Sequence, residues 1–136
     1  MKSKLLLVCV VVALSGCSAH SPMILKNTTD VHPTVSERYS SHSNPVLVVE
    51  GPLPADIKYE VIATIDVGKI WYSGSDGILV EMARRGREMG ADAVINVKRW
   101  RQPSGFAWAA PHGQGQAVRI VDEAKRRDLS ALGKLL

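Results

Sequence analysis

The sequence has few cysteines, little net charge and no apolar run long enough to cross a membrane. Its 136 residues include two cysteines, Cys9 and Cys17. We expect Cys9 to be removed with an export segment and Cys17 to be covalently modified. The mature chain then has no thiol for a disulfide, a nucleophile or a metal site. Its fold must therefore be held together by its core alone.

The small charge and the short length exclude further classes. The formal net charge is +4, and it falls to +2 once Lys2 and Lys4 leave with the export segment. A nucleic-acid-binding protein would show a dense basic face, so we expect no nucleic-acid partner. One compact domain is the limit, because the chain is too short for a TIM barrel or for a dinucleotide fold paired with a substrate domain.

The N-terminus has the three parts of a secretory signal. Lys2 and Lys4 precede the apolar run 5–14, and the small residues Ser15 and Gly16 follow it. Ten residues make a helix of roughly 15 Å, whereas a bilayer core needs about 30 Å. The run therefore cannot span a membrane, and residues 1–16 are predicted to be a signal peptide.

The motif Leu14-Ser15-Gly16-Cys17 resembles the lipobox of bacterial lipoproteins. This resemblance implies cleavage between Gly16 and Cys17, diacylglycerol on the Cys17 thiol and an acyl chain on the new amine. The alternative is an ordinary signal-peptidase site followed by a chance cysteine. Three acyl chains give stable anchoring, so the membrane is the first expected partner. Ser18 stands where an aspartate would favour inner-membrane retention, which implies an outer-membrane anchor with the domain facing the periplasm.

Residues 17–45 read as the lipidated cysteine and a flexible polar tether. Ser, Thr, Asn, His and Pro dominate this stretch, and no apolar period is visible. A flexible coil of this length has a reach of about 30 Å. We therefore expect the tether to lift a small domain clear of the lipid headgroups.

The remaining chain predicts an α+β domain over 46–123 and a helical tail over 124–136. Short β-branched or alternating runs predict strands, and apolar residues at three- and four-residue steps predict an amphipathic helix that ends at Gly90. The expected strands are 46–50, 59–67, 93–100 and 117–122, and the expected helix is 78–89. We thus predict one helix packed on a small mixed sheet of three to four strands, with a β-α-β unit and a short C-terminal helix.

Residues 101–116 form a long connection, and loops of this length are usually functional or disordered. Aromatic residues there and before the helix either fold back over an open end of the core, which we favour, or anchor a partner protein. Burial of Phe106 and Trp108 decides between the two. The candidate partner-binding residues are Trp71, Tyr72, Phe106, Trp108 and His112.

No catalytic set is visible, so we expect a protein that is not an enzyme. The sequence has no Gly-x-Ser-x-Gly elbow, His-Glu-x-x-His motif or P-loop. His20, His32 and His42 lie in the expected tether, where nothing fixes a geometry for general-base work. We interpret them as polar filler and expect neither a metal site nor a cofactor, and His112 has no partner nearby in the sequence.

The run Met82–Val97, with Gly90-Ala91-Asp92-Ala93-Val94 at its centre, resembles the helix-to-strand junction of the YbjQ-like family and of RcsF-type outer-membrane lipoproteins. Residues 114–120 are similar to the closing strand of that family. The resemblance covers about 46–122 and implies a small α+β domain, ring-shaped oligomers in YbjQ-like members and envelope-stress sensing in RcsF-type members. This chain differs from the RcsF type by lacking structural disulfide cysteines.

These observations lead to two hypotheses about function. The first is an outer-membrane-anchored lipoprotein whose periplasmic domain is a non-enzymatic protein-interaction or envelope-stress-sensing module, with an envelope protein as its partner. The second is a small-ligand or metal-binding module in which clefts of a homo-oligomer use Trp71, Tyr72 and His112.

Overall fold

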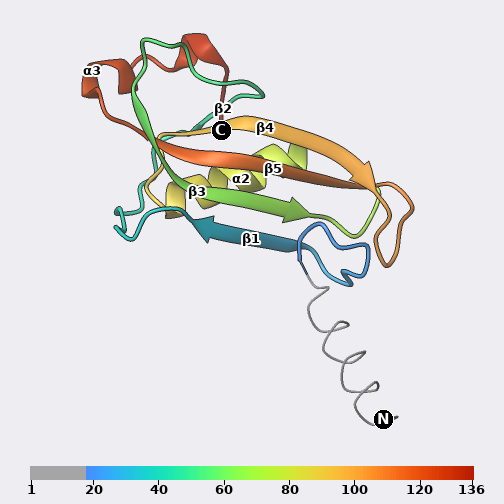
Figure 1. Cartoon of the computed structure of the whole chain (residues 1–136). Helices are drawn as coiled ribbons and strands as arrows, with labels where there is room; N and C mark the ends of the chain where they lie inside the picture. The colour runs from blue at the N-terminus through green and yellow to red at the C-terminus, as the bar shows by residue number, and fades with distance from the viewer. Residues whose placement is uncertain (1–17) are drawn as a thin grey trace.

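The computed structural model describes residues 18–136 (Figure 1). The expected signal segment 1–16, with the predicted cleavage position Gly16, and the predicted lipidation residue Cys17 lie outside the described residues. In chain order the elements are β1 (Thr28–Pro33), β2 (Leu47–Val48), β3 (Tyr59–Gly68), α2 (Asp76–Glu88), β4 (Ala93–Gln102), β5 (Ala110–Ile120), α3 (Glu123–Arg126), the 3₁₀ turn η1 (Ser130–Leu132) and β6 (Lys134–Leu135).

The described residues form a six-stranded mixed sheet in the order β1-β3-β5-β4-β2-β6. β3 and β4 both run antiparallel to β5, which lies between them, so β3 and β4 are parallel to each other. α2 makes the crossover between these two strands. β1 pairs antiparallel with β3 at one edge, and the short strands β2 and β6 complete the other edge.

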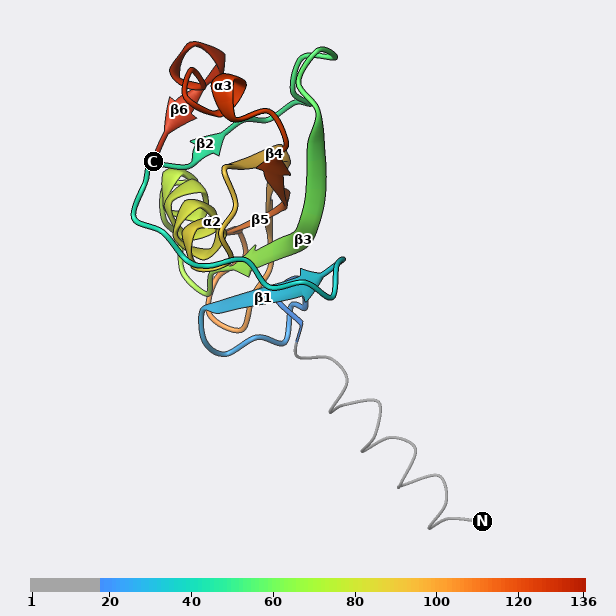
Figure 2. The ribbon, with the colours of Figure 1, turned by 90° about the vertical axis from the view of Figure 1, so that its left-hand side faces the viewer.

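α2 packs against one side of the sheet, which curves around it (Figure 2). The helix buries the residues that recur at three- and four-residue steps in its sequence. They are Ile78, Leu79, Met82, Ala83 and Gly86. Gly90 follows the helix with a φ of +77°, the left-handed conformation that glycine adopts without strain.

Gly113 and Gly115 on β5 leave room for side chains of α2 and β4. A Cβ atom on Gly113 would lie 2.5 Å from Cγ2 of Ile78, and one on Gly115 would lie 2.7 Å from Cγ1 of Val94. A side chain at either position would therefore displace its neighbours. On the opposite side of the sheet, a second apolar cluster covers the end near Ile120.

The predicted fold, one helix on a sheet of three to four strands, is wrong, because the described part of the chain is mostly sheet. The sheet has six strands, two more than the largest number predicted. α2 is the one helix longer than a single turn among the described residues. β5 begins at Ala110, inside the stretch that the sequence assigned to a loop. The C-terminal tail forms α3, η1 and β6 in place of one continuous helix.

The prediction of a flexible tether over 17–45 is wrong for the residues that the structure places on the sheet. Residues 28–33 form the edge strand β1, whose Val31 is opposite Ile65 of β3. Ala19 and Ile24, which precede this strand, are buried with 0% and 2% of their surface exposed. The folded domain therefore begins at Ala19 and not at residue 46.

Candidate functional site: an aromatic tip beside the N-terminus

Three segments meet at one end of the sheet, to the right in Figure 1. They are residues 18–27 before β1, 69–75 after β3 and 103–109 between β4 and β5. They meet there because β1 starts, β3 and β4 finish, and β5 starts at this end of the antiparallel ladders. We call these three segments together the aromatic tip.

Hydrogen bonds join the three segments to one another. The amide of Gly105 donates to the carbonyl oxygen of Ile24 at 3.2 Å, and the hydroxyl of Ser104 donates to the carbonyl oxygen of Ile70 at 2.7 Å. The amide of Ile70 donates to Oδ1 of Asn27 at 3.1 Å. The tip is thus a cross-linked surface and not three independent loops.

Four predicted aromatic residues lie together on this tip. The rings of Trp71 and Phe106 stack with centroids 5.6 Å apart, and the Tyr72 hydroxyl accepts a hydrogen bond from the amide of Trp108 at 3.1 Å. Trp108 is 83% exposed, Phe106 is 48% exposed, and Trp71 and Tyr72 are each 58% exposed. The interpretation that these residues cover the core is therefore wrong.

Two aliphatic side chains extend the apolar surface of the tip. Met23 is 70% exposed and Leu25 is 68% exposed. Six of the ten large apolar side chains that are exposed in the described part of the chain thus lie in these three segments. A gathering of this kind on a small protein is typical of an interaction surface.

The charge of the tip is all of one sign. Residues 18–27 and 69–75 contribute Lys26 and Lys69, and the three tip segments contain no Asp or Glu. Arg101 adjoins them from the end of β4. The Arg101 guanidinium donates to the carbonyl oxygens of Ser73 and Ala109, both at 3.0 Å, which holds this cation at the tip. The tip therefore combines exposed aromatic rings with the positive charges of Lys26, Lys69 and the adjoining Arg101.

His112 does not belong to the exposed surface, although the sequence grouped it with the aromatic residues. It lies in β5 and is fully buried, with its ring 6.0 Å from that of His20 and 6.3 Å from that of Trp100. Neither ring nitrogen has a hydrogen-bond partner among the described residues. Burial lowers the pKa of His112 below its ordinary value of 6.5, because desolvation disfavours the imidazolium. Among residues 18–136, His112 is therefore closed off from solvent and from any ligand cleft.

The structure brings together a cluster that the sequence reasoning missed. Nε2 of His20 lies 2.9 Å from Oδ1 of Asp66, and Nε2 of His32 lies 3.0 Å from Oδ2 of the same carboxylate. The side-chain amide of Gln114 donates to Oδ1 at 2.8 Å. Asp66 is 7% exposed, so this carboxylate is nearly buried and is satisfied by three side chains from different parts of the chain.

This cluster fastens the N-terminal residues to the sheet. His20 comes from the tip segment, His32 from β1, Asp66 from β3 and Gln114 from β5. His20 also packs against Trp100, with ring centroids 4.7 Å apart. In residues 18–136, no group of three or more His, Cys, Asp or Glu residues is arranged to hold a metal ion. The geometry is that of a hydrogen-bonded clamp.

The clamp depends on the absence of a side chain at Gly68. A Cβ atom there would lie 2.0 Å from the carbonyl oxygen of Ala19. Gly68→Ala is therefore expected to lower the free energy of unfolding by about 1–3 kcal/mol and to speed amide exchange in residues 19–33. Hydrogen-exchange mass spectrometry and urea unfolding measure the two effects.

Gly74→Ala is the matched control, because a Cβ atom on Gly74 would meet nothing within 4 Å. It should change the stability by no more than about 0.5 kcal/mol. Equal exchange in the two variants would show that residues 19–33 are not held against Gly68.

Comparison with known proteins returns no match to any family model, curated protein or solved structure. The resemblance to YbjQ-like and RcsF-type proteins therefore stays a prediction from short motifs.

Proposed function

We propose that the protein is an outer-membrane lipoprotein whose domain is a non-enzymatic interaction module in the periplasm. Its acyl chains on Cys17 hold it in the membrane, and its sheet-rich domain makes contact with another envelope component. Contact with an envelope protein and sensing of envelope stress are the two forms of this proposal that the sequence suggests.

The exposed aromatic tip is the observation that carries the proposal. Trp108 has most of its surface in water, although its indole is among the side chains that contribute most to binding when they are covered. Exposure of a single such residue would be ordinary, but here four aromatic residues and two aliphatic ones share one end of the domain. The tip is also held by hydrogen bonds to the sheet ends, so it is ordered before binding, which lowers the entropic cost of contact.

Crosslinking in intact cells tests whether the tip is the contact surface. A photo-crosslinking amino acid at Phe106 is expected to form a strong, defined adduct on illumination, visible as a shifted band or as an added mass. The matched control position is Val121, which is 68% exposed and lies just beyond the other end of β5. Adducts of equal strength from both positions, or none from Phe106, would refute the tip as contact surface.

A further inference from the structure

The lipidation residue and the aromatic tip are joined by very little chain. Ala19 is fully buried, and its amide donates to Oδ2 of Asp30 at 2.7 Å. Only Ser18 separates Ala19 from Cys17. Because consecutive Cα atoms are 3.8 Å apart, the Cα of Cys17 lies within about 8 Å of the Cα of Ala19. The expected tether of about 30 Å is thus replaced by a single linking residue.

A link of this length brings the tip to the membrane surface. The headgroup layer on each side of a bilayer is about 5–8 Å thick. With its acyl chains inserted, Cys17 sits at the inner boundary of this layer, so the neighbouring segments of the tip meet the headgroups. Trp and Tyr are enriched at this depth because one part of each ring system is apolar and another forms hydrogen bonds.

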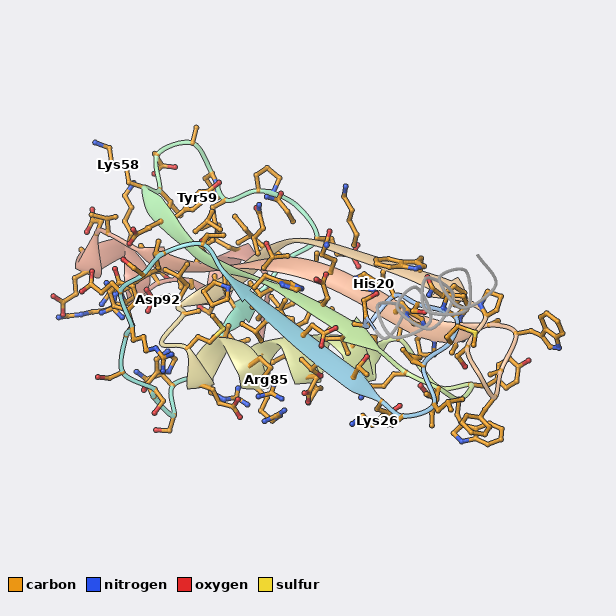
Figure 3. All side chains as sticks on the ribbon, turned by 60° about the horizontal axis from the view of Figure 1, so that its bottom comes forward. His20, Lys26, Lys58, Tyr59, Arg85 and Asp92 are labelled. Atoms are coloured by element: carbon orange, nitrogen blue, oxygen red, sulfur yellow. The ribbon has the colours of Figure 1, made fainter. Side chains whose placement is uncertain are left out.

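The charge of the tip fits the same surface. Lys26, Lys69 and Arg101 face no carboxylate within the tip segments, and anionic headgroups attract such cations. Figure 3 shows Lys26 at the same end of the molecule as His20, with Lys58 and Tyr59 at the other end. The cations therefore lie on the side where the acyl chains enter the bilayer.

We infer that the aromatic tip docks on the bilayer that holds the acyl chains, with its aromatic side chains among the headgroups. The inference rests on the proposed lipid anchor and names the membrane surface, rather than a protein, as the partner of the tip. β5 then leads away from the bilayer for about 35 Å, so that the end near Val121 points into the periplasm. The faces of the sheet stay available to a protein.

Tryptophan fluorescence of the lipid-modified protein tests this docking. The protein is reconstituted into vesicles of phosphatidylethanolamine and phosphatidylglycerol, with and without lipids that are brominated near the headgroup end of their acyl chains. The emission of Trp71 and Trp108 in the vesicles is expected to lie to the blue of that of a tryptophan in water. Brominated lipids should quench this emission, and the bilayer should shield it from quenching by acrylamide. Replacing both residues by Phe should remove most of the quenching and leave the emission of Trp100.

A tryptophan at the other end of the domain is the matched control. Val121→Trp in the Trp71→Phe/Trp108→Phe background is expected to stay unquenched by lipid and open to acrylamide. Equal quenching at both ends, or emission of Trp71 and Trp108 that stays unquenched, overturns the docking. If unquenched emission accompanies a protein adduct from Phe106 in cells, the proposed function stands and membrane docking fails; if Phe106 gives no adduct either, both fail.

Discussion

Replacing Met82 by alanine is expected to lower the free energy of unfolding by about 2–5 kcal/mol. Met82 is completely buried between α2 and the sheet, where its side chain fills the space left by Gly113 and Gly115. Its Cε and Sδ atoms lie only 3.1 and 3.4 Å from where Cβ atoms on these glycines would stand. Truncation leaves a cavity there, because the glycines have no side chain that could move in to fill it.

Urea or guanidinium unfolding measures this loss, and Val80→Ala is the matched control. Val80 lies two residues before Met82 on the same helix, yet it is 52% exposed. Its truncation should change the stability by no more than about 0.5 kcal/mol. Similar losses for the two variants would contradict the packing of α2 on β5.

The sequence predicted well the elements that carry their own periodic signal. α2 has an apolar stripe at helical spacing and lies at Asp76–Glu88, close to the predicted 78–89. β3 alternates apolar and polar residues because one of its faces packs under the helix. In both cases the residues in the core between α2 and the sheet recur at a regular spacing, so a single stretch of sequence records them.

β1 carries no such signal, since it is an edge strand whose residues are all half-buried or exposed. Its sequence is Thr-Thr-Asp-Val-His-Pro. The segment is held on the sheet by pairing with β3 and by the contact between His32 and Asp66. The residues of β3 that pair with β1 lie 30 to 40 positions away along the chain, and Asp66 lies 34 positions after His32. Local composition could therefore only indicate a polar segment, which we interpreted as a tether.

The first half of β5 was missed for the opposite reason. Gly113 and Gly115 look like loop residues, but the space beside them is filled by Ile78 and Met82 of α2 and by Val94 of β4. Side chains of α2 occupy the space there, so this face of β5 lacks the apolar side chains by which a buried strand is normally identified in a sequence. The same error placed His112 in an exposed loop, and the Asp66 clamp was hidden because its four residues are brought together only by the sheet.

Cys17→Ala is expected to abolish incorporation of radiolabelled palmitate and to remove the protein from the outer-membrane fraction. Each acyl chain contributes about 0.8 kcal/mol for every methylene that it buries, and two such anchors already give stable attachment. No helix in residues 18–136 is long and apolar enough to cross a membrane. Labelling followed by membrane fractionation measures both effects.

Cys9→Ala is the matched control, because Cys9 lies within the apolar run of the expected signal and should leave label and location unchanged. Palmitate on the Cys17→Ala protein, or its unchanged recovery in the outer membrane, would contradict the lipid anchor. Without the acyl chains, the electrostatic attraction that remains is small: anionic lipids supply about 1 kcal/mol for each of Lys26, Lys69 and Arg101. Salt screens such an attraction, so it gives reversible binding. In this proposal, permanent attachment therefore comes from the lipid on Cys17, and the aromatic tip sets how the attached domain is oriented on the bilayer.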